Sequence, residues 1–288
     1  MRHFTFLLLF AVSLFSTTST AQNLEKSLLW EISGNGLEQP SYLYGTIHMT
    51  CDASLDANIK KALDDTSLLV LEVDMDDPSM AMKMANDIYM KDGKTLKDLV
   101  SAEDYTILSD FLKTQTGMPA EMIGNIKPFF ITAMMYPKLL DCAAVQSFEN
   151  ELMKIAHEQE EEVLGLETVE EQMAVFDQIP YKDQAQDLLR SAKDNMSFDK
   201  AAFQKMMELY VEKDIEGLAK LMEEDVNLTN TKHKDVILDN RNKNWIAKIE
   251  DFAKQQPTFF GVGAGHLPGE NGVIKLLQKK GYTVKPIM

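Results

Sequence analysis

The residues best suited to chemistry in this sequence follow two short apolar segments that are far apart in the chain. The segment Ser41–Thr46 is followed by Ile47 and His48, and a second segment, which starts at Thr258, runs through three glycines to His266. A glycine stands three residues before each histidine, so both segments read strand–G-x-x-H. In open α/β sheets, ligands bind just beyond the carboxyl ends of the strands. Glycine permits the tight backbone and the close ligand approach needed there. The repeated pattern predicts two halves that meet at one site.

Two glutamates lie in comparable strand-like segments. Glu72 sits inside the apolar run LLVLEVD, and Glu167 ends the run EVLGLE. A carboxylate in a buried strand is costly unless a cation, hydrogen-bond donors or a metal compensate it. Two histidines and two carboxylates form a normal ligand set for a divalent metal with one open position. We therefore predict that His48, Glu72, Glu167 and His266 share one metal site.

Structural roles remain open for these four residues. A histidine after a strand is often a hydrogen-bonded structural residue, and a strand glutamate is often half of an ion pair. The spacing matches none of the short metal motifs, such as H-E-x-x-H. The segment GVGAGH also resembles a dinucleotide-binding loop. However, the last glycine of G-x-G-x-x-G falls on His266, and the chain ends too soon for the acidic residue that should follow.

Arg241 and Asn242 lie in the polar segment LDNRNKNWIAKIE. Three interpretations stay open for this pair. They could lie on a solvated helix face, they could bind a substrate carboxylate, or they could hold one of the glutamates from behind. We predict substrate binding as their role.

The elements that must position these residues are strands at both ends of the chain and helices between them. Apolar runs, alternation and turn residues predict strands and helices as follows. The strands are 28–33, 41–46, 67–74, 162–167, 258–262 and 283–287, and the main helices are 53–65, 80–90, 102–114, 128–140, 147–160, 169–178, 182–193, 198–211, 215–222, 232–254 and 272–279.

This order predicts an α/β fold with a central mixed sheet built from two pseudo-related halves. A large all-helical insertion occupies about 78–160 and 169–254, and residues 22–288 form a single domain. The many methionines are best interpreted as core residues.

The amino terminus has the pattern of a secretory signal peptide. Arg2 precedes the apolar stretch Phe4–Phe15, and Ser19, Thr20 and Ala21 are small residues suited to cleavage before Gln22. We therefore expect residues 1–21 to be removed and the protein to be periplasmic or extracellular. No later run approaches the ~20 apolar residues of a membrane span, so no stable span is expected after cleavage.

Composition excludes some partners. The formal net charge is −16, and 45% of the residues are hydrophobic, which is enough for a large core. An acidic chain without a basic stripe argues against nucleic acid and anionic membrane surfaces. A peptide or a small-molecule substrate remains, and the sequence does not determine the oligomeric state.

The two cysteines, Cys51 and Cys142, are an even pair in a protein expected to be exported, which favours a disulfide. Cys51 follows His48 by three residues, so this bridge would brace a site loop against the helical middle. Two free buried thiols remain the alternative.

With these motifs the sequence resembles the TraB/GumN family, which is related to the TIKI metalloproteases and more distantly to ChaN and the erythromycin-esterase-like proteins. The resemblance covers nearly the whole mature chain. It rests on the segments LLWEISG, SYLYGTIHM, LLVLEVD, EEVLGLETVEEQMAVFD, LDNRNKNWIAKIE and TFFGVGAGHLPGENGVIKLLQKKGYTV.

The resemblance places the two G-x-x-H motifs of the family on Gly45–His48 and Gly263–His266. It places the acid of the first half on Glu72, the GLET motif on Gly165–Thr168, and the arginine of the R-N motif on Arg241. It implies a metal-dependent hydrolase, with TIKI members acting as Mn- or Co-type proteases on exported peptides.

We accordingly predict an exported metallopeptidase-like hydrolase that uses a divalent ion, Mn, Co or Zn. Either Glu72 or Glu167 could serve as general base in place of a ligand. The alternative is a protein of the cell envelope that binds a metal, haem or a peptide without turnover, as the resemblance to ChaN permits.

Overall fold

The computed structural model describes residues 24–224 and 228–288. The predicted signal peptide and the predicted mature amino terminus at Gln22 lie outside these described residues. Across the two described ranges, no helix combines the length and the apolar character that crossing a membrane requires.

The described residues form one six-stranded mixed sheet, with the strands in the order β4-β3-β5-β2-β1-β6. The four strands β4, β3, β5 and β2 are parallel to one another, and β1 runs antiparallel between β2 and β6. The strand bounds are β1 Leu29–Ser33, β2 Ser41–Thr46, β3 Leu68–Val73, β4 Glu162–Glu167, β5 Phe259–Gly263 and β6 Thr283–Pro286. This arrangement confirms the predicted α/β fold with a mixed central sheet.

The two strands that carry the G-x-x-H motifs are direct neighbours. Gly45 of β2 is in register with Val262 of β5, and Thr46 is in register with Gly263. Since parallel strands end at the same edge of a sheet, the segments that lead to His48 and His266 leave the sheet side by side. Strands β3 and β4 end at this edge too, with Val73 opposite Glu167.

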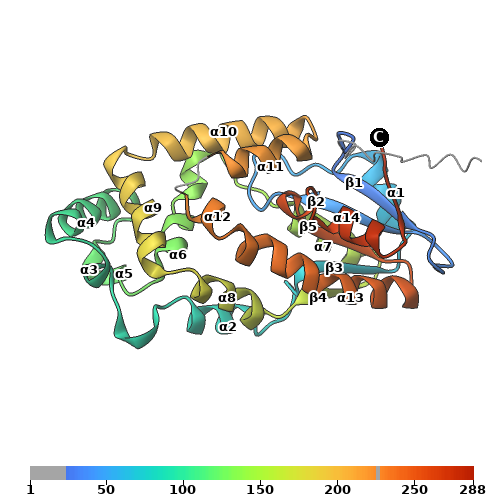
Figure 1. Cartoon of the computed structure of the whole chain (residues 1–288), viewed down its shortest axis with the longest axis horizontal. Coiled ribbons are helices and arrows are strands. Elements are labelled where there is room, and N and C mark those ends of the chain that lie inside the picture. Colours follow the sequence, from blue (N-terminus) through green and yellow to red (C-terminus); the bar gives the residue numbers. More distant parts are fainter. Residues whose placement is uncertain (1–23, 225–227) are drawn as a thin grey trace, which may run out of the picture.

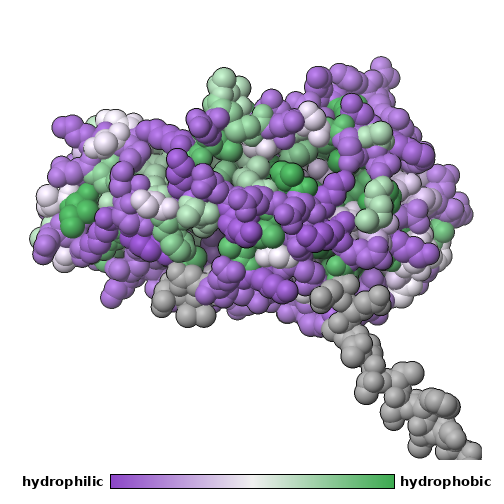
Figure 2. Space-filling model, turned by 90° about the horizontal axis from the view of Figure 1, so that it is seen from above, coloured by the Kyte–Doolittle hydropathy of each residue, from purple (hydrophilic) through white to green (hydrophobic). Residues whose placement is uncertain are grey.

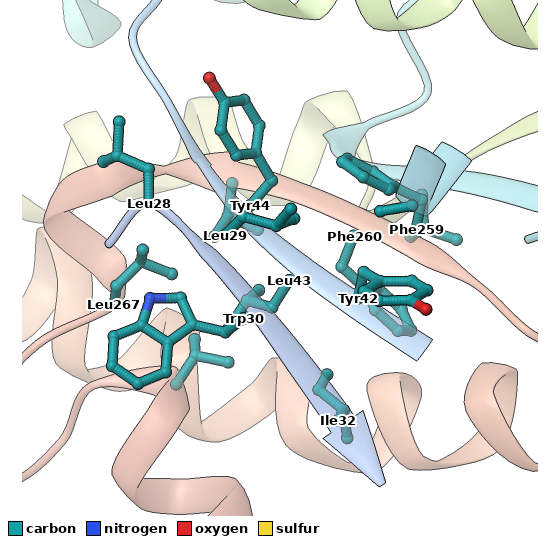
Figure 3. Close-up of a cluster of buried hydrophobic side chains, with 14 of the residues drawn as sticks. Leu28, Leu29, Trp30, Ile32, Tyr42, Leu43, Tyr44, Phe259, Phe260 and Leu267 are labelled. Carbon is teal, nitrogen blue, oxygen red and sulfur yellow. The ribbon is translucent and has the colours of Figure 1, made fainter. Parts of the chain in front are cut away.

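The core of this sheet is a large cluster of buried apolar side chains (Figure 3). The fully buried central strand β3 is an apolar run apart from Glu72, as expected for a strand covered on both faces. On one face, Tyr44 contacts Phe148 at the start of α7, with ring centroids 5.9 Å apart. The Tyr44 hydroxyl also lies 3.3 Å from the hydroxyl of Tyr210 on α10.

Most of the other described residues are helical, and helices lie both beside the sheet and at the end of the molecule away from it (Figure 1). Helices α3, α4, α5, α6 and α9 bury a second apolar cluster of their own, which includes Leu108, Ile131 and Leu188. The helix bounds are α1 Ala57–Asp64, α2 Met80–Asp87, α3 Leu96–Leu99, α4 Ala102–Thr116, α5 Ala120–Ile123, α6 Pro128–Ala133, α7 Phe148–Glu158, α8 Val169–Gln178, α9 Tyr181–Lys193, α10 Ser197–Val211, α11 Ile215–Glu223, α12 Thr229–Lys232, α13 Asn240–Gln255 and α14 Val273–Lys279, with short 3₁₀ turns at Lys91–Gly93, Tyr136–Leu139 and Ala264–His266.

Two predicted helices are interrupted in the structure. The segment predicted as one helix over 128–140 is α6 followed by a 3₁₀ turn, because Pro137 has no N–H for the helical ladder. The helix predicted over 232–254 begins earlier, as α12, and passes through the π-helical segment Asp235–Asp239 before α13. This π-helical segment ends two residues before Arg241. Short π-helical segments are frequently found at functional sites.

The surface is mainly hydrophilic. Figure 2 shows polar residues over most of the visible face, with hydrophobic residues in separate small areas. The large exposed apolar side chains include Met82, Met122 and Val211, which belong to different helices. Apolar side chains scattered in this way are normal for a folded domain.

A disulfide joins Cys51 and Cys142, as the sequence predicts. Beside it, the Thr50 and Gln146 backbones exchange two hydrogen bonds of 3.0 and 2.8 Å. The bridge and this backbone pairing tie the loop after His48 to the segment that enters α7.

Replacing both cysteines with alanine should destabilise the protein. The bridge closes a loop with a sequence separation of 91 residues, for which chain entropy corresponds to about 4–5 kcal/mol. Urea unfolding of the oxidised protein and of the double variant measures the difference. Reduction of the wild type should produce the same loss, and a double variant as stable as the oxidised wild type would contradict the expectation.

Candidate functional site

The carboxyl edge of the sheet contains a buried cluster of ionic side chains. Arg241 of α13 lies between the two strand glutamates, with its Nη2 2.5 Å from Oε2 of Glu72 and 2.6 Å from Oε1 of Glu167. Only 11% of the Arg241 side chain is exposed, and both glutamates are similarly buried. The guanidinium group of Arg241 therefore joins the ends of β3 and β4, whose glutamates the sequence assigned to one site.

All three nitrogen atoms of the Arg241 guanidinium donate hydrogen bonds. Its Nε donates to both carboxylate oxygens of Glu167, and its Nη1 donates to the Ile237 carbonyl at 3.0 Å. That carbonyl belongs to the π-helical segment, so the irregular backbone supplies an acceptor to the buried cation. The guanidinium also lies over the Trp245 ring, 4.8 Å from its centroid, where cation–π attraction adds to the ion pairs.

The charges of the cluster do not cancel. Burial raises the pKa of Glu72, but interactions with His266, Arg241 and His48 outweigh that effect and bring the pKa to about 2. Because His266 is neutral at physiological pH, Arg241 is the adjoining cation that keeps Glu72 ionised. The Gly263 N–H also donates to Glu72, at 2.8 Å. Two carboxylates beside one guanidinium leave a net charge of about −1, which favours a further cation.

His266 is buried and neutral. Burial lowers its pKa to about 3, with Arg241 acting in the same direction and Glu72 opposing it. Its Nδ1 lies 2.6 Å from Oδ1 of Asn242, so the ring donates its proton there. The unprotonated Nε2 then accepts from Arg241 Nη1 at 3.2 Å and lies 3.6 Å from Oε1 of Glu72. A lone pair of His266 is thus directed into the ionic cluster.

His48 occupies a different environment at the same edge. Its side chain is 70% exposed, and its Nδ1 lies 2.8 Å from Oε1 of Glu149 on α7. The hydrogen bond to Glu149 raises the pKa of His48 to about 9. Burial raises the pKa of Glu149, but hydrogen bonds from His48, Ser147 and Thr46 hold it at about 2. His48 is therefore the cation of a pair with a buried carboxylate.

Two glycines of the motifs are required by close packing. A Cβ on Gly45 would lie 2.7 Å from the Leu267 side chain and 3.1 Å from Ala264, so this glycine lets the turn after β5 pack on β2. A Cβ on Gly165 would lie 2.6 Å from the Asp74 backbone nitrogen and 2.8 Å from the Glu167 carbonyl oxygen. Gly165 therefore permits the close approach of the backbone that follows β3 and of the Glu167 carbonyl.

Several contributors to this site were missed by sequence reasoning. Trp245 donates to Glu167 at 3.1 Å, and Gln172 donates to both strand glutamates at 3.2 Å. Glu149 was missed as well, because an acidic residue in the first turn of a helix is common and carries no signal of burial. Trp245 had a weak signal, since it lies four residues after Arg241 on one helix face.

Asn242 is buried and fully occupied. Besides accepting from His266, its amide nitrogen donates to the carbonyls of Asn271 and His266, at 2.8 and 3.3 Å. Only 1% of the residue is exposed. In the structure, Asn242 binds His266, and Arg241 binds the two glutamates. Of the three interpretations left open for this pair, these contacts fit the one in which it holds a site residue from behind.

The predicted metal ligands meet the requirements of a metal site only in part. Within residues 24–224 and 228–288, no group of three or more His, Cys, Asp or Glu side chains is arranged to hold a metal ion. Nε2 of His266 and Oε1 of Glu72 lie 3.6 Å apart, a separation suited to two ligands of one ion. Glu167 fits less well, because Arg241 and Trp245 engage both of its oxygens.

A cavity of about 170 Å³ lies elsewhere, against the Tyr44 side of the sheet, where Phe148 and Tyr210 line it. None of the residues of the ionic cluster lines this cavity. Polarity and charge therefore mark the sheet edge as the candidate site, whereas the cavity is mainly apolar.

The comparisons with known proteins agree with these motifs. The model of the TraB/PrgY/gumN family matches residues 28–286. Metalloprotease TIKI1 of Danio rerio is 23% identical over 321 aligned residues, which cover 93% of this chain and 64% of TIKI1. The chain thus spans slightly less than two thirds of that relative. No solved structure matches this chain.

Replacing Arg241 with methionine should destabilise the protein by about 3–5 kcal/mol, because two buried carboxylates would lose their common cation. Urea unfolding at neutral pH measures this loss. Lys248 on the same helix is the matched control, since its side chain is 44% exposed and its contact with Glu171 is 3.6 Å. Lys248→Met should cost at most about 1 kcal/mol, and equal losses in the two variants would contradict a special role for Arg241.

Stability should have its maximum near pH 6.5 in the metal-free protein. The folded-state pKa of His266, about 3, lies below the usual histidine value of 6.5, so its contribution is lost as pH falls from about 6.5 toward 3. The folded-state pKa of His48, about 9, lies above 6.5, so its contribution is lost as pH rises through 9. The free energy of unfolding, measured with urea and a chelator across pH 4.5–9, shows the loss on the acid side (the acid limb) and on the alkaline side.

The acid limb can be assigned with one substitution. Between pH 6.5 and about 4.5, the usual pKa of a glutamate, the unfolded chain protonates His266 before it protonates its carboxylates. His266→Gln should therefore flatten that part of the profile. An acid limb as steep in His266→Gln as in the wild type would show that another group causes it.

Proposed function

This chain belongs to the TraB/PrgY/gumN family, and on that premise we propose that it is an exported metal-dependent hydrolase that cleaves peptide bonds. The observation that carries the proposal is the pair formed by His266 Nε2 and Glu72 Oε1. The two atoms lie 3.6 Å apart at the carboxyl edge of the sheet, beside a cluster whose net charge is negative. The name of the related metalloprotease supports a metal and a peptide substrate.

The ligands in this proposal are Glu72 and His266, joined by His48 from the neighbouring strand end. His48 would release one proton on binding the ion. A divalent ion held there, Mn, Co or Zn, would supply Lewis acidity and lower the pKa of a bound water. Glu167 has a different role, because its contacts with Arg241 and Trp245 make it the anchor of the guanidinium.

The chain's own residues prepare the site for hydrolysis. Asn242 holds the proton of His266 at Nδ1 and so keeps Nε2 unprotonated. Arg241 keeps Glu72 ionised and places a fixed positive charge at the sheet edge. A guanidinium in such a position stabilises negative charge that develops on a substrate oxygen. His48, paired with Glu149, lies at the exposed side of the edge, where a substrate would enter.

Export is part of the same proposal. The amino-terminal sequence has the features of a signal peptide, and the disulfide between Cys51 and Cys142 is typical of an oxidising compartment. A peptide in the periplasm or outside the cell is therefore the proposed substrate.

The second candidate function is capture of a metal, haem or peptide without turnover. It is supported by the occupation of both strand glutamates by Arg241, which leaves the edge without an open catalytic position among the described residues. Arg241 also contacts the Nε2 lone pair of His266, so metal uptake would require the guanidinium to move.

The mature protein should gain thermal stability on addition of MnCl₂, CoCl₂ or ZnCl₂, because a ligand bound only by the folded state stabilises it by mass action. It should also cleave members of a peptide library, and chelation should abolish cleavage. His48→Ala and Glu72→Gln should lose both the metal-dependent shift and the cleavage. His157→Ala, which alters an exposed histidine paired with Asp76, is the control and should behave as wild type.

The outcomes separate the two functions. A metal-dependent shift without cleavage of any peptide would favour the binding protein. Variants of His48 and Glu72 that keep the wild-type shift would contradict the proposed ligands.

A further inference from the structure

We propose that Glu149 is a positioning residue for His48, which fixes the imidazole so that Nε2 faces the site edge. The inference rests on the proposed function, because it assigns His48 a role in that site. Glu149 comes from α7, is absent from both G-x-x-H motifs, and meets His48 across 101 residues of sequence.

The contacts of Glu149 are those of an anchored acceptor. Its side chain is 6% exposed. Its Oε1 lies 2.8 Å from His48 Nδ1 and accepts from the Thr46 hydroxyl at 2.6 Å, while its Oε2 accepts from the Ser147 hydroxyl at 2.6 Å. Thr46 is the last residue of β2, and Ser147 is the residue before α7. Hydrogen bonds from the end of β2 and from the start of α7 thus fix the Glu149 carboxylate independently of His48.

The hydrogen bond determines which nitrogen of His48 is presented. In the neutral ring, a carboxylate that accepts a hydrogen bond from Nδ1–H leaves Nε2 as the unprotonated position, at the opposite side from Glu149. This is the arrangement by which a carboxylate orients a histidine that ligates a metal. The ring of His48 is 70% exposed, so the bond to Glu149 is the contact that sets its orientation in this proposal.

His266 is held in the same way by a different group. Its Nδ1 lies 2.6 Å from the Asn242 amide oxygen. Both G-x-x-H imidazoles are therefore fixed at Nδ1 by a side-chain oxygen from a helix, α7 in one case and α13 in the other. The agreement between two sites that differ in burial and in partner supports a common purpose, which is to present Nε2 of each ring.

The surroundings of the pair are braced independently. The Cys51–Cys142 disulfide and the paired backbones of Thr50 and Gln146 join the loop after His48 to the segment before Glu149. The Gln146 side chain adds a third link, by accepting from the Ala53 N–H at 3.0 Å. The segments that carry His48 and Glu149 are thus joined to each other beside the hydrogen bond between these two residues.

The first experiment reads the proton on the ring. Histidine-selective ¹⁵N NMR of the full mature chain, free of metal and at pH 10 or above, distinguishes a proton on Nδ1 from one on Nε2. The wild type should carry the His48 proton on Nδ1. Glu149→Leu removes the acceptor and should move the proton to Nε2 in most molecules, and Glu149→Gln should retain the Nδ1 form because its amide oxygen can still accept.

Glu151→Leu is the matched control, since it removes an acidic residue from the same first turn of α7. It should leave the His48 signals at their wild-type positions. A purely structural role for Glu149 would alter stability without moving the proton, so a folded Glu149→Leu variant with wild-type His48 signals would overturn the proposal. If Glu149→Leu does not fold, the wild-type spectrum still decides, because a ring with its proton on Nε2 also overturns it.

The second experiment titrates the chain with MnCl₂, CoCl₂ and ZnCl₂ by calorimetry. Glu149→Leu should bind the ions about 10- to 100-fold more weakly than wild type. Glu149→Gln should recover part of that loss, and Glu151→Leu should bind within about twofold of wild type. Unchanged affinity in Glu149→Leu would overturn the positioning role. A wild type that binds none of the ions but carries its proton on Nδ1 would overturn the proposed function and support the positioning of His48 by Glu149.

Discussion

The buried ion pairs of Arg241 are the interaction on which the candidate site depends. Glu72 and Glu167 lie buried near the carboxyl ends of two neighbouring parallel strands, and two such carboxylates repel each other without a cation. The guanidinium is suited to both because its planar, always charged fork donates to several oxygens at once. The π-helical segment and the packing on Trp245 hold that fork in place. The helix is thus irregular at Ile237, whose carbonyl accepts a hydrogen bond from the buried guanidinium.

The two histidines of the site differ because their surroundings differ. His266 is buried beside the guanidinium, so its pKa is low, and its bond to Asn242 leaves a lone pair on Nε2. His48 is exposed and bonded to a buried carboxylate, so its pKa is high. Identical G-x-x-H motifs therefore produce one neutral and one cationic imidazole, because burial lowers the pKa of His266 and the hydrogen bond to Glu149 raises the pKa of His48.

Much of the framework could be predicted from local sequence. Apolar runs between turn residues located the strands, since a strand buried on both faces has few polar positions. The repeated G-x-x-H pattern indicated a common edge, and β2 and β5 are indeed neighbours in parallel register. Helix bounds were less predictable where Pro137 breaks the ladder and where the π-helical segment precedes α13, because apolar periodicity alone does not distinguish hydrogen-bond spacings within a helix.

The sequence by itself determined which residue types reach the sheet edge: Glu72, Glu167 and the two motif histidines follow from strand length and from glycine placement. Only the tertiary structure decided their partners. Arg241 meets Glu72 across 169 residues, and Glu149 meets His48 across 101. Such contacts arise when helices pack on the sheet, and no local pattern separates a buried glutamate in the first turn of α7 from an exposed one. The chemistry of each ionisable group follows from burial and neighbouring charge, which exist only after the chain has folded.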